Sequence, residues 1–212
     1  VLEPSSSLPL ERLVVILVQL GVSSSLGWDA GLVEGRFAAE REAATKNSYR
    51  VGAEFTDLTP AQQARALFDP NGNLPPVIET VRTDATLRFT KPWDRQALQS
   101  TPPQITEIEI ADLSGSWGKV TLRAEGSLTV DDTGVPTGSI SVQAREWRHL
   151  LEMAVAAEWI APAFLPALES GLDLLATLDG DSATIEAKIA FENGFIRVGS
   201  VPLGPAPRIV IR

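Results

Sequence analysis

The chain has 212 residues, of which 44% are hydrophobic and 21% charged, and it carries a formal net charge of −9 at neutral pH. These proportions indicate a folded protein and exclude a disordered chain, and the negative charge argues against nucleic acid or an anionic membrane surface as the main partner. Because cysteine is absent, disulfides, thiolate metal sites and cysteine nucleophiles are excluded.

The N-terminal part of the sequence has neither a basic segment nor a signal-type apolar run, and it begins at Val1 rather than at methionine. We therefore expect that an N-terminal anchor or signal and upstream strands are missing. Residues 1–212 then form either a single β-rich domain or the C-terminal part of a larger one. Residues 11–23 are compatible with a strand or a helix, and their β-branched content favours a buried strand. Their apolar core, Leu13 to Leu20, is too short for a membrane span.

Alternation of apolar and polar residues with period two predicts most of the remaining strands. The clearest case runs from Val81 to Thr90, where every second residue is apolar or small. A short helix is predicted over residues 61–68 after Pro60. Asn193-Gly194 predicts a type I′ hairpin turn, because both residues tolerate a positive φ. Further antiparallel strands are predicted over 49–55, 107–110, 120–125, 140–144, 183–191, 195–198 and 209–211.

The period changes to that of a helix in two adjacent segments, about 146–157 and 162–178. Pro162 separates them, because proline cannot continue a preceding helix. Their apolar stripes have to be covered, most simply by one face of the sheet. We therefore predict an α+β fold with a predominantly antiparallel, long and curved β-sheet, a meander or roll, on which a helical hairpin packs.

The sequence offers no recognisable catalytic, cofactor-binding or metal-ligating residues. His149 is the only histidine, so a histidine triad or a histidine-rich zinc site cannot be built. Five tryptophans accompany a single tyrosine, and we expect them to be core residues for the most part. The functional hypothesis is an apolar groove between the sheet and the two helices. Its candidate lining residues are Trp117, Trp147, Leu151, Trp159, Phe164 and Leu168.

An ordered series of Trp, Gly and Pro motifs extends from about residue 89 to residue 208, and it resembles the domain of unknown function 2125 family of exported alphaproteobacterial proteins. The resemblance implies a periplasmic location, with tethering of the full-length protein to the inner membrane. It transfers no activity and no site residue. The motifs are Lys91-Pro92-Trp93-Asp94-Arg95, Pro103-x-Ile105, Trp117-Gly118, Ala124-x-Gly126, Gly134-x-Pro136-x-Gly138, Trp147-Arg148, Phe191-x-Asn193-Gly194 and Val201-Pro202-Leu203-Gly204-Pro205-Ala206-Pro207.

These observations favour a non-enzymatic envelope protein that binds an apolar ligand, such as a lipid, on the concave face of its sheet. The alternative is a structural or assembly module that binds another envelope protein through a sheet edge. A hydrolase that uses carboxylates is a distant third, since no spacing identifies a pair of carboxylates in one pocket. The expected partners are thus a lipid or another envelope protein, and not nucleic acid. The oligomeric state is left open.

Overall fold

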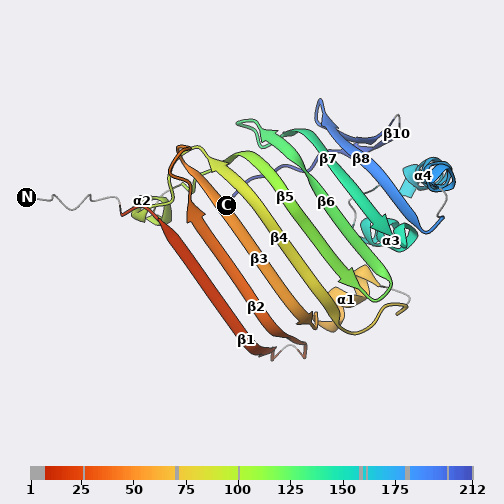
Figure 1. Cartoon of the computed structure of the whole chain (residues 1–212), viewed down its shortest axis with the longest axis horizontal. Coiled ribbons are helices and arrows are strands. Elements are labelled where there is room, and N and C mark those ends of the chain that lie inside the picture. Colours follow the sequence, from red (N-terminus) through yellow and green to blue (C-terminus); the bar gives the residue numbers. More distant parts are fainter. Residues whose placement is uncertain are drawn as a thin grey trace, which may run out of the picture.

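The computed structural model describes residues 8–25, 27–69, 72–99, 101–157, 160, 162–179, 182–199 and 201–211. Within these residues, ten strands form one open antiparallel sheet in which each strand lies beside its neighbours in sequence (Figure 1). The strands are β1 (Arg12–Ser23), β2 (Asp29–Arg41), β3 (Ser48–Leu58), β4 (Ile78–Phe89), β5 (Ile105–Trp117), β6 (Val120–Val130), β7 (Pro136–Arg145), β8 (Thr184–Glu192), β9 (Phe195–Val198) and β10 (Val201–Pro205).

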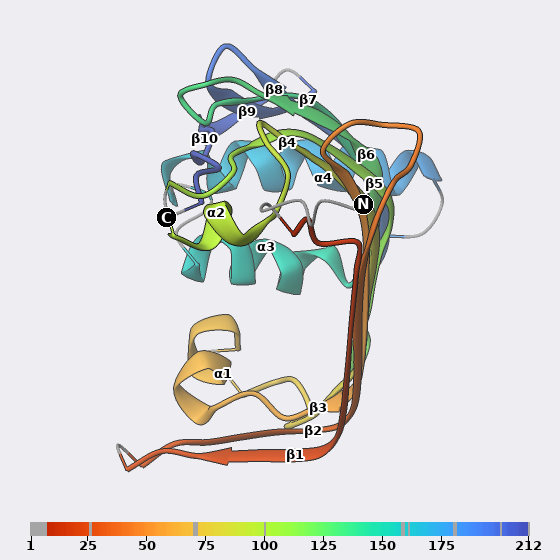
Figure 2. The ribbon, with the colours of Figure 1, turned by 90° about the vertical axis from the view of Figure 1, so that its left-hand side faces the viewer.

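The helices are short and lie on one side of the sheet, which curves around them (Figure 2). The protein is therefore mostly β, and the predicted α+β class overstates the contribution of the helices. The helical segments are α1 (Gln62–Phe68), α2 (Arg95–Gln99), α3 (Trp147–Ala156), the 3-10 turn η1 (Pro162–Phe164) and α4 (Leu165–Asp179).

Helices α3 and α4 lie close to the two predicted ranges, but the predicted helical hairpin is not shown. α4 contacts β8 and β10, whereas α3 contacts α1 and β6. The two helices share one cluster of buried side chains, but each also contacts different elements of the fold. The antiparallel meander itself was predicted correctly, because hairpins between consecutive strands are the simplest way to join such a series.

The segment over residues 11–23 is strand β1, as predicted, but the expectation that it is buried was wrong. Among the strands that the structure describes, β1 lies at one end of the sheet and pairs with β2 alone. Almost all of its side chains are exposed. A β-branched run is typical of a buried strand and equally of an apolar edge strand, and only the pairing distinguishes the two.

The sheet turns sharply in β1 to β3, as Figure 2 shows. Gln19 in β1 and Asp57 in β3 both have a positive φ, of 50° and 51°, which is uncommon for residues with a side chain. In the register of the sheet, both residues lie at the level of Val33 in β2. The two irregularities thus fall at one level across three strands, where they help the sheet to bend.

The C-terminal segment after β10 is held by individual hydrogen bonds and is not the short strand predicted over residues 209–211. The Ile209 amide donates to the Gly134 carbonyl at 2.8 Å. The side-chain amide of Gln104 bonds to both backbone groups of Ile211, accepting from its N–H and donating to its carbonyl, each at 3.0 Å. Hydrogen bonds to Gly134 and Gln104 therefore hold this segment against the sheet, although it does not form a strand of the sheet.

Candidate functional site

The two faces of the sheet differ in chemistry. Strand register connects residues of successive strands into rows, and rows that contain Ala144, Ile185 or Ala187 lie on the face that α3 and α4 cover. We call this face the inner face. One inner-face row runs through Leu17, Gly35, Phe55, Val81, Gly115, Leu122, Ala144 and Ile185. The next runs through Val15, Phe37, Ala53, Thr83, Leu113, Ala124, Val142 and Ala187.

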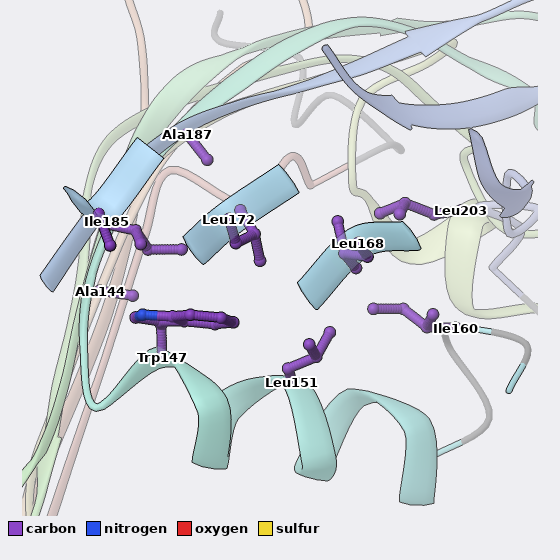
Figure 3. Close-up of a cluster of buried hydrophobic side chains, with 10 residues drawn as sticks. Ala144, Trp147, Leu151, Ile160, Leu168, Leu172, Ile185, Ala187 and Leu203 are labelled. Atoms are coloured by element: carbon purple, nitrogen blue, oxygen red, sulfur yellow. The ribbon is translucent and has the colours of Figure 1, made fainter. Parts of the chain in front are cut away.

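Three of the predicted groove residues, Trp147, Leu151 and Leu168, meet in a packed hydrophobic cluster between α3, α4 and the sheet (Figure 3). Trp147 is only 2% exposed. Its indole N–H donates to the Ser182 carbonyl at 3.2 Å, and the Arg148 guanidinium lies 4.3 Å from the ring centroid. These side chains fill the space between the helices and the sheet. At this place they act as core.

The other predicted groove residues are not in this cluster. Trp117 belongs to a second cluster with Leu74 and Val120, and its indole N–H donates to the Pro75 carbonyl at 2.7 Å. Phe164 is half-buried in η1, next to α4. Trp159 lies outside the described residues. The other five residues, which the structure describes, therefore do not belong to one common cluster.

A different set of apolar residues remains accessible on the inner face, where it crosses β1 to β4. The α3 and α4 cluster covers the rows at β6, β7 and β8. Toward β1 the members of these rows are half-buried or exposed, apart from the buried Gly35, and Val15 is 37% exposed. In the adjacent inner-face row, which runs through Leu13, Ala39, Val51 and Ala85, Leu13 is 42% exposed and Ala39 is buried. We call this set the inner strip. It consists of Leu13, Val15, Leu17, Phe37, Val51, Ala53, Phe55, Val81 and Ala85.

The inner strip was missed because its members come from four strands. The alternation within residues 49–55 and 81–90 does show which side chains share a face. However, nothing local tells which part of that face a helix covers. The number of predicted strands could have indicated it. Two helices of 10 and 15 residues cannot cover the full width of a ten-stranded sheet, so part of its inner face has to remain uncovered.

The outer face carries charged pairs between neighbouring strands. Arg50 on β3 donates to Asp84 on β4 through two bonds of 2.9 and 2.6 Å. Arg82 pairs with Glu54 at 2.5 Å, and Arg88 with Glu107 at 2.6 Å. The hollows on this face are lined mainly by polar and charged residues such as Asp112, Arg123 and Glu186. The polar part of this face is a solvated surface and is not suited to bind an apolar ligand.

Among the described residues, two carboxyl groups have altered pKa values, and both have structural causes. The hydrogen bonds from Arg50 hold the pKa of Asp84 below its usual value. At the turn after β6, hydrogen bonds from the Val135 and Thr133 amides and from the Thr133 hydroxyl lower the pKa of Asp131. Two acids that both prefer the charged form do not make the acid and base of a hydrolase.

These shifts predict a loss of stability in acid. A carboxyl whose pKa is lower in the folded state stabilises the protein above its unfolded pKa, here about 4, and the contribution is lost as the pH falls through the folded value. We expect Asp84→Asn to remove the contribution of the Asp84 carboxylate to the free energy of unfolding. This contribution is less than about 1 kcal/mol, because the Arg50–Asp84 pair is exposed. Unfolding in urea between neutral and acid pH measures this. Equal acid sensitivity in the variant and the parent protein would contradict it.

Among the described residues, no group of three or more acidic or histidine side chains is placed to hold a metal ion. No helix within them is long and apolar enough to cross a membrane. No curated protein and no solved structure matches the chain. Residues 1–207, nearly the whole chain, match the family described as "Uncharacterized protein conserved in bacteria (DUF2125)". The chain belongs to the DUF2125 family.

Several of the sequence motifs on which the family resemblance rests have structural roles in this protein. In the DUF2125 chain, Trp93 stacks edge-on against Phe89, with ring centroids 5.7 Å apart. The Trp93 amide donates to the Tyr49 hydroxyl at 3.1 Å, and Asp94 caps α2 by accepting from the Ala97 amide at 2.9 Å. Asn193 and Gly194 both have a positive φ in the β8–β9 turn, as predicted. The motifs thus hold strands and turns in place.

Proposed function

We propose that this DUF2125 protein is a non-enzymatic protein of the periplasm that holds an apolar ligand, such as the acyl chain of a lipid, against the inner strip. The observation that carries the proposal is the contrast, on β3 and β4, between an accessible apolar inner face and an outer face of paired charges. Single half-exposed aliphatic side chains are ordinary, but a contiguous set of them over several neighbouring strands marks an interaction surface. An accessible apolar surface of this extent is typical of a binding site.

The physical gain comes from removing both partners from water. Each methylene of an acyl chain that leaves water contributes about 0.8 kcal/mol, and the strip side chains are buried at the same time. No charged side chain belongs to the strip, so the ligand does not have to desolvate an ion there. The acidic chain and the absence of cysteine are compatible with a periplasmic protein, in agreement with the exported family that the motifs resemble.

Binding of a fluorescent long-chain fatty acid to the purified protein tests the proposal. We expect saturable binding that is weakened about tenfold in the double variant Val51→Gln and Val81→Gln, because a change of about 1.4 kcal/mol corresponds to a factor of ten. Both residues are half-buried members of the inner strip. The matched control is Thr86→Gln with Thr121→Gln, two residues of the outer face.

Thermal melting of both double variants has to show that they are folded. Native mass spectrometry after incubation with phospholipid vesicles then identifies whether whole lipids are retained. The proposal fails if no lipid or fatty acid binds. It also fails if the Thr86 and Thr121 substitutions weaken binding as much as those of Val51 and Val81.

A further inference from the structure

A single polar residue, Thr83 of β4, lies among the apolar residues of the inner face. The inner-face rows that begin at Leu17 and Val15 contain only apolar residues and glycine, apart from Thr83. The third row begins at Leu13 and has no polar member between β1 and β8. Beyond Ala85 it continues through Ile110, Gly126, Ile140 and Ile189. All members of these three rows belong to the described residues.

Thr83 lies in the middle one of the three rows. It pairs with Ala53 of β3 and with Leu113 of β5. Because side chains alternate along a strand, Thr83 shares the inner face with Val81 and Ala85. Two of these four neighbours, Ala53 and Ala85, carry only a methyl group. A molecule that lies on the inner strip can therefore approach the Thr83 hydroxyl closely.

The Thr83 hydroxyl makes no hydrogen bond within the part of the chain that the structure describes. Thr83 is half-buried, and no described side-chain oxygen or nitrogen is both fully buried and without a partner. The hydroxyl oxygen is thus reachable from the inner side of the sheet. Threonines of the outer face do find partners: the Thr80 and Ser116 hydroxyls lie 2.9 Å apart, and the Thr129 hydroxyl donates to the Thr137 carbonyl.

An apolar molecule on the inner strip would cover this hydroxyl. A hydroxyl that loses its water and gains no partner opposes binding, whereas a hydroxyl that donates to an oxygen of the ligand favours it. Valine has almost the same shape, suits a strand equally well and would continue the apolar surface. A threonine at this one position therefore indicates that the ligand brings a hydrogen-bonding group to it.

This group of the ligand has to be uncharged. None of the three rows contains a charged side chain. The charges next to Thr83 in sequence belong to the outer face, where Arg82 pairs with Glu54 and Asp84 with Arg50. A carboxylate or phosphate over Thr83 would lose its water without gaining an opposite charge, which is unfavourable. An uncharged oxygen avoids this cost.

We propose that the ligand of the inner strip is an acyl ester, and that the Thr83 hydroxyl donates a hydrogen bond to its carbonyl oxygen beside Ala53 and Ala85. The assignment rests on the proposed function and adds the chemical class of the ligand. The ester carbonyl accepts a hydrogen bond and carries no charge, and the attached hydrocarbon covers the aliphatic side chains. Neutral acylglycerols and phospholipids share this ester, and the charged group of a phospholipid can stay in water beyond the strip.

Two fluorescent probes that differ only in the ester group test the hydrogen bond. These are the methyl ester of a pyrene-labelled fatty acid and a pyrene-labelled alkane of matching length. We expect Thr83→Val to weaken ester binding about fivefold to tenfold, as for one lost hydrogen bond, without weakening alkane binding. Thr83→Ser keeps the hydroxyl and should bind the ester like the parent protein. Thr86→Val, on the outer face of the same strand, is the matched control.

Infrared spectroscopy gives a readout that a purely structural role of Thr83 would not change. A hydrogen bond to an ester carbonyl lowers its stretching frequency. With an isotope-labelled carbonyl, the bound ester should therefore absorb at higher frequency in Thr83→Val than in the parent protein and in Thr83→Ser. Thermal melting shows whether the variants are folded. Native mass spectrometry after incubation with phosphatidylglycerol vesicles that contain diacylglycerol shows which of the two esters is retained.

The possible failures are distinguishable. If both probes bind, but Thr83→Val leaves ester binding unchanged or weakens ester and alkane equally, the role of Thr83 is overturned and the apolar site is not. The same carbonyl frequency in the parent protein and in Thr83→Val also overturns the hydrogen bond. Retention of neither lipid from the vesicles overturns the acyl ester as the ligand. If neither probe binds the parent protein, the proposed function fails, and this assignment fails with it.

Discussion

Trp147→Ala is expected to lower the free energy of unfolding by about 3–5 kcal/mol, the range for removing a large aromatic side chain from a packed core. Trp147 is 2% exposed and lies where α3, α4 and the sheet meet (Figure 3). Its loss leaves a cavity beneath Leu168 and Leu172. It also leaves the Ser182 carbonyl without its indole donor. Urea denaturation followed by circular dichroism measures the change.

The matched control is Phe195→Ala, because Phe195 is an aromatic residue that is 53% exposed in β9. We expect this change to cost less than about 1 kcal/mol. Trp147→Phe should lose less than Trp147→Ala, since it retains part of the buried area. A loss below about 1 kcal/mol for Trp147→Ala would mean that the α3 and α4 cluster does not stabilise the fold, and that this space is open to a ligand after all.

Gly126→Ala or Gly138→Ala is expected to destabilise the protein by about 3 kcal/mol or more. Gly126 has a φ of 152° and Gly138 one of 140°, and a residue with a side chain is strained at such values. A Cβ at Gly126 would lie 2.3 Å from the Ser139 carbonyl oxygen, and one at Gly138 would lie 2.3 Å from that of Ser127. Strands β6 and β7 would have to separate to admit either methyl group.

Gly52→Ala is the control for this pair. Gly52 is also a strand glycine, but its φ is not in the positive region, and a Cβ would lie 3.8 Å from the nearest heavy atom, the Thr83 carbonyl oxygen. We expect this change to be neutral or slightly stabilising. Thermal melting of the three variants makes the comparison. Similar melting temperatures for Gly126→Ala and Gly52→Ala would contradict the close approach of β6 and β7.

The strands that were predicted correctly are those whose pattern is complete within a single segment. Residues 81–90 alternate without interruption, and the structure extends this strand to Ile78–Phe89. The turn at Asn193-Gly194 is equally local, because its conformation depends on two residues. The helix predicted over 61–68 is present as α1, Gln62–Phe68.

Strand β2 was not predicted, because its sequence depends on the adjacent strand β3. Gly31 and Gly35 interrupt the apolar alternation that a strand should show. In the structure, a Cβ at Gly35 would lie 3.0 Å from Cδ1 of Phe55. The glycine makes room for the Phe55 ring on the adjacent strand. A small residue that accommodates a large side chain on the adjacent strand can be recognised only once the register of the two strands is known.

The candidate site illustrates the same limit. The residues of the predicted groove were chosen because they are apolar and lie in or near the predicted helices, but whether such side chains fill a space or line it depends on packing. Trp147, Leu151 and Leu168 fill it. The inner strip became visible only from the pairing of β1 to β4. Pairing between strands 20 or more residues apart leaves little trace in one sequence.

The pairing of every strand with its neighbours in sequence also has a kinetic consequence. Apart from β7 and β8, which pair across residues 146–183, neighbouring strands are joined by connections of fewer than 20 residues. The chain therefore closes mostly short loops as it folds, and folding should be fast for a β-protein of this size. The sheet should grow strand by strand from its centre, and β1 and β10, which each have one neighbour among the described strands, should fray first. Amide hydrogen exchange would then decrease stepwise from β1 toward β5, as in a repeat array in which each unit depends only on the next.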